Sequence, residues 1–181
     1  MVSANSPVEA LRLAIRNVPD FPKKGIVFRD ITTLWKDPRH LRSAVELLSG
    51  PFRSSGIAKV ACIEARGFIL GGAIAQALGA GFVPIRKRGK LPSETLRQEY
   101  ALEYGMDSIE IHRDAIAPGD RVLVHDDLLA TGGTARAACR LVESLGGTVV
   151  GVCFLVELSF LGGRGQLKGY DVTSLIDYDA E

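Results

Sequence analysis

From residue 59 onward, short apolar runs alternate along the chain with stretches in which apolar residues recur at helical spacing. This alternation is typical of parallel strands joined by crossover helices, so it predicts an α/β fold with a parallel sheet. Ligands bind beyond the carboxyl ends of the strands in such sheets. The predicted strands and helices are, in order, residues 60–63, 68–78, 82–85, 122–124, 134–145 and 149–156.

Two amphipathic helices are predicted before this alternating region. The first has Ser6 at its cap, Pro7 at its first helical position, and Glu9, which completes a capping box. We expect this helix to end near Pro19. The second starts at the Asp-Pro pair of residues 37 and 38, has its apolar residues on one face, and is closed by the Gly-Pro pair of residues 50 and 51.

Composition adds limits to this picture. The 181 residues are 46% hydrophobic, and no long Pro-, Gly- or Ser-rich linker interrupts them, which predicts one domain over residues 1–181 with a three-layer core. The formal net charge of +1 gives no global reason to expect a nucleic-acid or anionic-membrane surface. Local clusters of charge are therefore interpreted as sites.

Neither a targeting segment nor a disulfide framework is expected. The amino terminus lacks the basic and apolar segments of a secretory signal, and the longest apolar run, residues 149–156, is too short to span a bilayer. These features predict a cytoplasmic protein. Cys62, Cys139 and Cys153 are widely spaced in apolar surroundings, so we interpret them as core packing and not as disulfides or zinc ligands.

The stretch from Arg121 to Ala135 carries the strongest chemical signal. A buried strand over residues 122–124 is followed by Asp126 and Asp127, a small-residue turn, and a helix that begins near Thr134. A helix start offers free N–H groups to an anion, and glycines leave room for one, while the two acids suit sugar hydroxyls or Mg²⁺. The combination fits a ribose 5-phosphate, although an acid-rich strand end followed by an ordinary helix cap has a similar composition.

This run lacks the Gly-Lys-Ser/Thr of a Walker loop and the spaced glycines of a dinucleotide site. It resembles the 5-phosphoribosyl-1-pyrophosphate (PRPP) signature of the type I phosphoribosyltransferases, in its adenine phosphoribosyltransferase version. The resemblance implies a three-layer parallel-sheet core with a small N-terminal hood. It also implies that Asp126 and Asp127 bind the ribose of PRPP. The 5-phosphate would be bound by Ala130, Thr131, Gly132, Gly133 and Thr134.

A second motif, Glu64-Ala65-Arg66-Gly67, lies at the predicted junction of a strand and a helix. A guanidinium beside free N–H groups suits pyrophosphate, whereas an acid–Arg pair in a loop is commonly a surface salt bridge. In the resembled family the corresponding loop binds pyrophosphate, often through a cis peptide bond between residues other than proline. That bond would lie here between Glu64 and Ala65, and Arg66 would bind pyrophosphate.

A third motif is basic and begins directly after a predicted core strand. Four cations fall within residues 86–90, and such a cluster is commonly a solvated face, but a long loop in a compact domain is uncommon unless functional. Similar Arg-Lys-x-Gly-Lys-Leu-Pro and Leu-Glu-Tyr-Gly segments form the catalytic flexible loop of the resembled enzymes, which would span residues 87–105. By that resemblance Arg86 and Lys90 neutralise pyrophosphate, while Glu103 and Tyr104 come over the base.

A fourth motif spans residues 20–31 and, from the residues alone, fits an amphipathic edge strand with one inward aromatic. A similar segment forms the hood of adenine phosphoribosyltransferases, which would come mainly from residues 20–35. The resemblance implies that Phe28 stacks on adenine and that backbone groups at Val27 and Arg29 read its edge. Leu158 would line the same pocket.

Together the four motifs imply a purine-salvage enzyme that converts adenine and PRPP to AMP and pyrophosphate. The resemblance also implies Mg²⁺, held mainly by PRPP and pyrophosphate and contacted by Asp126 and Asp127, and a homodimer. Two rivals are an enzyme for another purine base and a non-enzymatic PRPP sensor that binds nucleic acid. The Val27-Phe28-Arg29 hood argues against the first, and the absence of a basic extension argues against the second. His125 departs from the family's usual aliphatic residue, and we interpret it as a packed core group.

Overall fold

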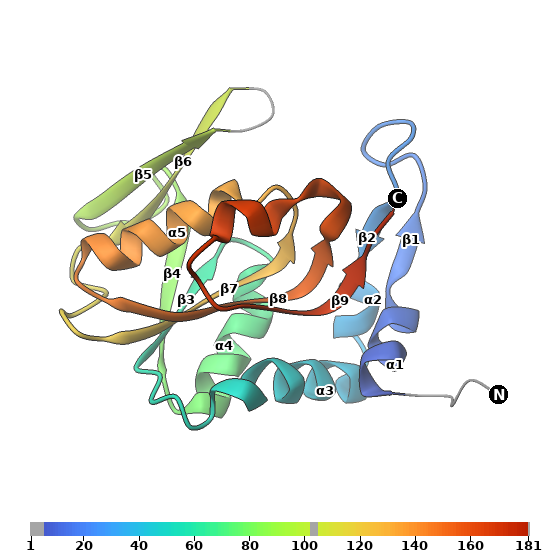
Figure 1. The fold of residues 1–181 in the computed structure, drawn as a ribbon, viewed down its shortest axis with the longest axis horizontal. Helices are drawn as coiled ribbons and strands as arrows, with labels where there is room; N and C mark the ends of the chain where they lie inside the picture. Colours follow the sequence, from blue (N-terminus) through green and yellow to red (C-terminus); the bar gives the residue numbers. More distant parts are fainter. Residues whose placement is uncertain (1–5, 102–104, 181) are drawn as a thin grey trace.

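The computed structural model describes residues 6–101 and 105–180 of the chain. Its centre is a seven-stranded sheet with the strand order β5-β6-β4-β3-β7-β8-β9 (Figure 1). The strands β3, β4, β7, β8 and β9 run parallel, and β5 and β6 extend one edge antiparallel. The predicted α/β class with a parallel sheet is therefore confirmed. The strands are β3 (Lys59–Ile63), β4 (Gly81–Lys87), β5 (Thr95–Ala101), β6 (Met106–His112), β7 (Arg121–Leu129), β8 (Thr148–Leu158) and β9 (Val172–Tyr178).

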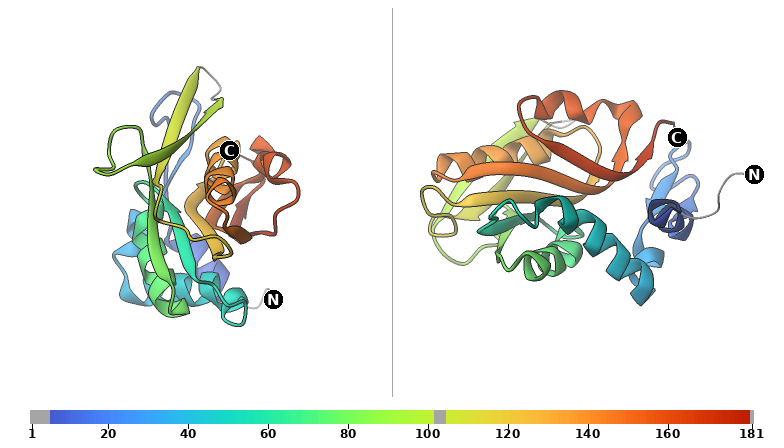
Figure 2. Two further views of the ribbon diagram at one scale, coloured as in Figure 1. Left: turned by 90° about the vertical axis from the view of Figure 1, so that its left-hand side faces the viewer. Right: turned by 60° about the horizontal axis from the view of Figure 1, so that its bottom comes forward.

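Helices cover both faces of this sheet, which gives the predicted three layers. The helices α3 (Pro38–Ser49) and α4 (Gly67–Leu78) lie on one face, and α5 (Gly133–Ser144) lies on the other (Figures 1 and 2). Each face has its own hydrophobic cluster, because the central strands bury apolar side chains in both directions. Within the described residues, no helix is long and apolar enough to cross a membrane.

The N-terminal region, which includes the expected hood of residues 20–35, consists of a short helix, a two-stranded ribbon and a second short helix: α1 (Pro7–Ala14), β1 (Arg16–Val18), β2 (Phe28–Asp30) and α2 (Thr32–Trp35). The expectation that the first helix runs to Pro19 is wrong. Ile15 is already extended, and Arg16 pairs with Asp30 in the ribbon while its Nε donates to Asp30 Oδ2 at 3.0 Å. Strand pairing with a residue fourteen positions away in the chain therefore ends the helix.

Three further features differ from the pattern-based prediction. β7 continues to Leu129, beyond the expected end at residue 124, because it pairs with β8 as far as Glu157. The segment expected to be a long loop contains β5, which pairs with β6 from Thr95 opposite His112 to Ala101 opposite Met106. The edge strand β9 follows the 3₁₀ turns η2 (Ser159–Leu161) and η3 (Gly163–Leu167), and a further turn, η1 (Gly50–Phe52), follows α3.

Candidate functional site

The carboxyl ends of β3, β4 and β7 surround a cavity of about 340 Å³. Three of the four sequence motifs reach this cavity: the Glu64 loop, the start of the basic segment, and the acid pair with its glycine turn. Their convergence follows from the parallel sheet, which brings the carboxyl ends of these strands to one edge. The cavity is lined by Ile63, Glu64, Ala65, Arg66, Lys87, Tyr100, Asp107, Ile109, Asp126, Asp127, Leu128 and Thr134.

Asp126 and Asp127 lie within β7, on the wall of this cavity. Asp127 is 4% exposed, and its Oδ2 lies 3.0 Å from Arg66 Nε. Asp126 Oδ1 accepts the N–H of Asp127 at 2.9 Å. Burial raises the pKa of both carboxyl groups, and the charge of Asp127 raises that of Asp126 further. Hydroxyl donors or a cation would stabilise the ionised form of this acid pair. A ribose supplies such hydroxyl donors, and a metal-bound substrate supplies such a cation.

A second, smaller cavity of about 80 Å³ lies against the turn between β7 and α5. α5 begins at Gly133 without a side-chain cap, so its first N–H groups are left for another acceptor. Gly132 has φ 83°, and a Cβ there would lie 2.3 Å from the carbonyl oxygen of Gly163. The glycine is therefore required by backbone geometry and by a neighbouring turn, and not only by space for an anion. Asp126, Leu128 and Thr134 line both cavities, so the two lie next to each other.

The junction between β3 and α4 connects the acid pair to the hood. The peptide bond between Glu64 and Ala65 is cis, as the resemblance implied. Arg66 follows as the N-cap of α4; its Nε faces Asp127, and its Cζ lies 5.6 Å from the centre of the Phe28 ring. A Cβ on Gly67 would lie 2.8 Å from Asp126 Oδ1, so only glycine lets α4 start this close to the acid pair.

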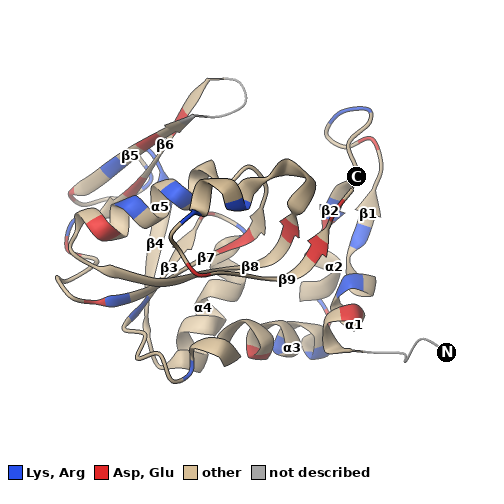
Figure 3. Cartoon of the chain, in the orientation of Figure 1, with Lys and Arg blue, Asp and Glu red and all other residues tan. Residues whose placement is uncertain are grey.

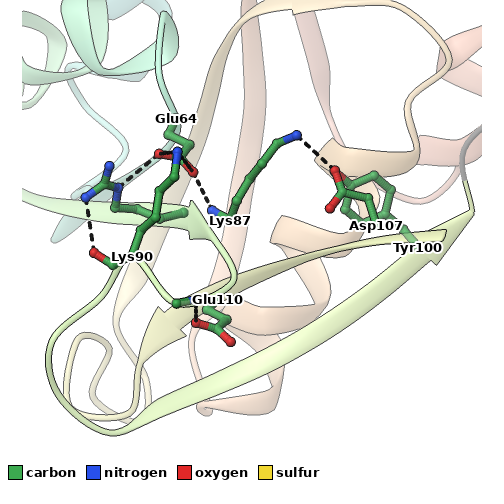
Figure 4. A network of polar contacts seen from close by, with 8 residues as sticks. Glu64, Lys87, Lys90, Tyr100, Asp107 and Glu110 are labelled. Carbon is green, nitrogen blue, oxygen red and sulfur yellow. Dashed lines mark hydrogen bonds and ion pairs between the residues drawn. The ribbon is translucent and has the colours of Figure 1, made fainter.

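The basic segment, residues 86–90, is held by acids on neighbouring elements. Arg86 and Lys90 both pair with Glu64, at 3.0 and 3.3 Å, while Lys87 Nζ lies 3.1 Å from Asp107 Oδ2 (Figure 4). Tyr100 donates its hydroxyl to the same Asp107 oxygen at 3.2 Å. Sequence reasoning gave no individual role to Lys87, Tyr100 or Asp107, because their contacts depend on the hairpin of β5 and β6. It placed Glu64 in the loop with Arg66, but the pairing of Glu64 with the basic segment requires β3 and β4 to be neighbours.

The hood places Phe28 on β2, half-buried, with Phe21 packed edge-on at 5.2 Å between ring centres. The Arg29 side chain lies over the Tyr178 ring at 4.1 Å and donates to Asn17 at 2.7 Å. The Arg29 guanidinium is thus engaged with other elements of the protein. Val27 and Leu158 are also half-buried. Glu103 and Tyr104 fall outside the described residues.

Acidic residues also mark the carboxyl-terminal halves of β8 and β9 (Figure 3). Glu157, 4% exposed, is the most buried of them, but its charge is met within the protein. It accepts from Arg164 Nε at 2.8 Å and from the hydroxyl of Ser174. By contrast, Asp127 Oδ2 is buried and, apart from its ion pair with Arg66, accepts no well-aligned hydrogen bond. Glu157 therefore has its hydrogen-bond donors within the protein, whereas Asp127 Oδ2 can still accept a hydrogen bond from a ligand.

Mg²⁺ fits this site as a companion of a phosphorylated ligand. Among residues 6–101 and 105–180, no group of three or more His, Cys, Asp or Glu side chains is arranged to hold a metal ion. Mg²⁺ is commonly bound through one or two carboxylates together with substrate phosphates and waters. The buried oxygen of Asp127 and the neighbouring carboxyl of Asp126 offer that type of partial ligand set.

His125 lies directly before the acid pair but faces the core. It is fully buried, and its Nδ1 lies 3.0 Å from the carbonyl oxygen of Cys153, so this nitrogen carries the proton and Nε2 is left without a partner. The interpretation of His125 as a packed core group is confirmed. Cys62, Cys139 and Cys153 are also buried free thiols, as predicted. Burial lowers the pKa of His125 from 6.5 to about 4, although the Cys153 carbonyl partly opposes this shift.

Replacing His125 with valine is expected to flatten the acid limb of the stability profile. The unfolded chain takes up a proton on His125 below pH 6.5 while the folded protein does so only near pH 4, so folding stability is lost as pH falls through this window. The loss from this group is about 3 kcal/mol. Urea unfolding of both proteins at several pH values between 6.5 and 4 measures the difference. Parallel profiles for parent and His125→Val would show that the imidazole is protonated equally in both states.

Comparison with known proteins gives a consistent result. Residues 36–175 match the model of the phosphoribosyl transferase domain family. The chain is 57% identical over 178 residues to an adenine phosphoribosyltransferase of Dinoroseobacter shibae, covering 97% of this chain and 99% of that protein. The crystal structure of adenine phosphoribosyltransferase from Thermoanaerobacter pseudethanolicus superimposes with a TM-score of 0.91 at 53% identity, over 94% of this chain and 99% of that one. The Saccharomyces cerevisiae enzyme, in complex with adenine and an imino-altritol bisphosphate, gives 0.88 at 39% identity, over 93% and 98% of the two chains.

Proposed function

The chain belongs to the adenine phosphoribosyltransferases, pentosyltransferases of purine salvage that convert adenine and PRPP to AMP and pyrophosphate, and we propose that the cavity beside Asp126 and Asp127 is where it performs this reaction. The observation that carries this assignment is that two cavities lie side by side. One is walled by the acid pair and Arg66, the other by the glycine turn, and Asp126, Leu128 and Thr134 line both. A ribose with a phosphate at each end needs such a neighbouring pair of subsites.

In the proposed complex the 5-phosphate lies in the smaller cavity, where it accepts N–H groups from the turn and the start of α5. This role falls to Ala130, Thr131, Gly132, Gly133 and Thr134. The ribose hydroxyls donate to Asp126 and Asp127, and the buried Asp127 Oδ2 then gains the hydrogen-bond donor that it lacks. These contacts fix C1′ of the ribose in the larger cavity.

The leaving pyrophosphate lies toward the basic side of the larger cavity. Arg66 is at its wall, and Arg86 and Lys90 lie beside Glu64 at its edge. N9 of adenine displaces the pyrophosphate through an oxocarbenium-like transition state, so positive groups near the departing oxygens lower the barrier. Mg²⁺, bound with PRPP and reached by Asp126 and Asp127, would neutralise further phosphate charge.

Adenine lies against the hood. Its flat face stacks on Phe28, and the backbone groups at Val27 and Arg29 read its edge, with Leu158 lining the pocket. Glu103 exchanges a proton with the base, and Tyr104 covers the reacting centre. Both roles come from the resemblance of the Leu-Glu-Tyr-Gly segment. Closure of this segment over the site would exclude water from a reaction that is open to hydrolysis.

The proposal includes a homodimer in the cytoplasm. The resembled enzymes pair so that a basic residue near Arg86 reaches the neighbour's pyrophosphate site. An exposed apolar patch supports pairing in this chain: Ile69 is 46% exposed and Phe82 is 40% exposed, and Phe82 packs edge-on against Phe68. This patch lies where α4 meets β4, the strand that leads into the basic segment.

A base-panel assay tests the proposed function. With PRPP and Mg²⁺ present, adenine is expected to give AMP with a kcat/KM roughly 10- to 100-fold above that of hypoxanthine or guanine. The reason is that a hood that reads the adenine amino group leaves polar groups unpaired against a 6-oxo purine. Comparable turnover of hypoxanthine would transfer the assignment to another purine base. PRPP binding without AMP formation from any base would favour a non-enzymatic sensor.

A further inference from the structure

Glu64 is a buried acid at the pyrophosphate side of the site to which the proposed reaction gives no role. It follows β3 directly, and its own N–H donates to the Ile85 carbonyl at 2.9 Å, which fixes the residue against β4. Its side chain is only 5% exposed. A carboxylate is rarely this buried unless its charge is compensated nearby.

Three donors from one short segment compensate this charge. Arg86 Nε donates to Glu64 Oε2 at 3.0 Å, Lys90 Nζ lies 3.3 Å from both carboxylate oxygens, and the Lys87 N–H donates to Oε1 at 2.5 Å. Arg86 also donates to the Lys90 carbonyl at 3.1 Å, so the segment curls around the carboxylate (Figure 4). Burial alone would raise the pKa of Glu64, but these hydrogen bonds outweigh it and hold the pKa below its usual range.

Two cations and a backbone N–H around one carboxylate form the kind of site that binds a phosphate oxygen. We propose that the Glu64 carboxylate occupies the pyrophosphate subsite as a built-in anion. Before the substrate binds, Glu64 holds Arg86 and Lys90 in place. After the reaction, Glu64 competes with free pyrophosphate for these two cations. This inference rests on the proposed role of these two cations. Glu64 is a positioning residue, and its competition weakens the hold on the released product.

The charge balance gives the direction of the effect. Without the Glu64 charge, Arg86 and Lys90 would present an uncompensated double positive charge to an incoming anion. Their side chains are 35% and 50% exposed, so solvent screens part of this attraction. Free pyrophosphate should then bind more tightly, while a loss of structural support alone would make it bind more weakly.

The test is calorimetric titration of the full-length protein with inorganic pyrophosphate in the presence of Mg²⁺. Glu64→Gln is expected to bind pyrophosphate at least about 5-fold more tightly than the parent, despite a lower melting temperature. Glu110→Gln is the matched control. Glu110 is also buried and accepts the Gly89 N–H of the same segment at 3.0 Å, an interaction that an amide oxygen can keep, so its affinity should equal that of the parent.

Two further variants separate the possible failures. Lys90→Met should weaken pyrophosphate binding; unchanged affinity would remove the proposed cation subsite and this inference with it. If Lys90→Met weakens binding while Glu64→Gln fails to tighten it, the subsite stands and competition by Glu64 is refuted. Should Glu64→Gln not fold, Glu64→Asp keeps the charge but draws it back by one methylene. It should still bind pyrophosphate more tightly than the parent, and equal or weaker binding overturns the inference.

Discussion

Replacing Glu103 with glutamine is expected to lower kcat by at least roughly 10-fold and to leave PRPP affinity nearly unchanged. Glutamine keeps the size and hydrogen-bonding capacity of the side chain but removes the titrating proton. A positioned general acid or base contributes about 10²–10⁴-fold in rate, whereas an exposed carboxylate without a role contributes little. Steady-state kinetics with adenine, together with PRPP titration, measures both quantities.

Glu99 provides the control for this prediction. It lies four residues earlier, on β5, where it is exposed, and its one ion pair with another described residue is a 3.9 Å contact with Arg97. Glu99→Gln should therefore be almost silent. If Glu103→Gln also matches the parent in kcat, proton transfer belongs to water or to another group. The segment around Glu103 would then act only by covering the site.

Replacing Asp127 with asparagine is expected to reduce kcat/KM for PRPP by about 100-fold, with the protein still folded. Asp127 is a buried acid of the cavity, and its charge meets Arg66 on one side and the proposed ribose hydroxyls on the other. An amide cannot hold the guanidinium by charge, and it offers one acceptor oxygen instead of two. Kinetics at varied PRPP and far-ultraviolet circular dichroism check the two parts of the expectation.

Asp126→Asn should also impair PRPP use, since Asp126 lines both cavities. The Asp126 substitution should reduce folding stability less than the Asp127 substitution. The reason is that the Asp126 carboxyl forms no ion pair among residues 6–101 and 105–180, and its pKa is raised well above the usual range. Intact PRPP kinetics in both variants would contradict the ribose-binding role of the pair.

The central part of the fold could be predicted because its signals are local. The strands β3, β7 and β8 each contain a short apolar run, at residues 60–63, 122–124 and 149–156, and α5 begins directly after its glycine turn, so each element is marked by its own residues. The acid pair and the turn are adjacent in the chain, so the sequence alone was enough to predict that they form one site. The cis bond between Glu64 and Ala65 came only from the family resemblance.

The missed elements depend on distant partners. β5 reads Thr-Leu-Arg-Gln-Glu-Tyr-Ala, a polar composition that suits a loop, and it is a strand because β6 pairs with all seven of its residues. In β9 only Ile176 is fully buried, so its apolar signal is weak. The contacts that Glu64 makes with the basic segment likewise require β3 and β4 to be neighbours. Sequence spacing alone cannot provide such pairings.

The contact between Gly132 and the turn at Gly163 limits how this proposed phosphate-binding loop can be transferred to another protein. A Cβ on Gly163 would lie 2.1 Å from the Ala130 carbonyl oxygen, just as one on Gly132 would strike the Gly163 carbonyl. The two segments are thus fitted to each other across thirty residues of chain. Grafting residues 126–134 alone into a different scaffold would therefore transfer only one of the two segments that fix the shape of the loop. The receiving scaffold would also need a side-chain-free turn at the position that Gly163 occupies here.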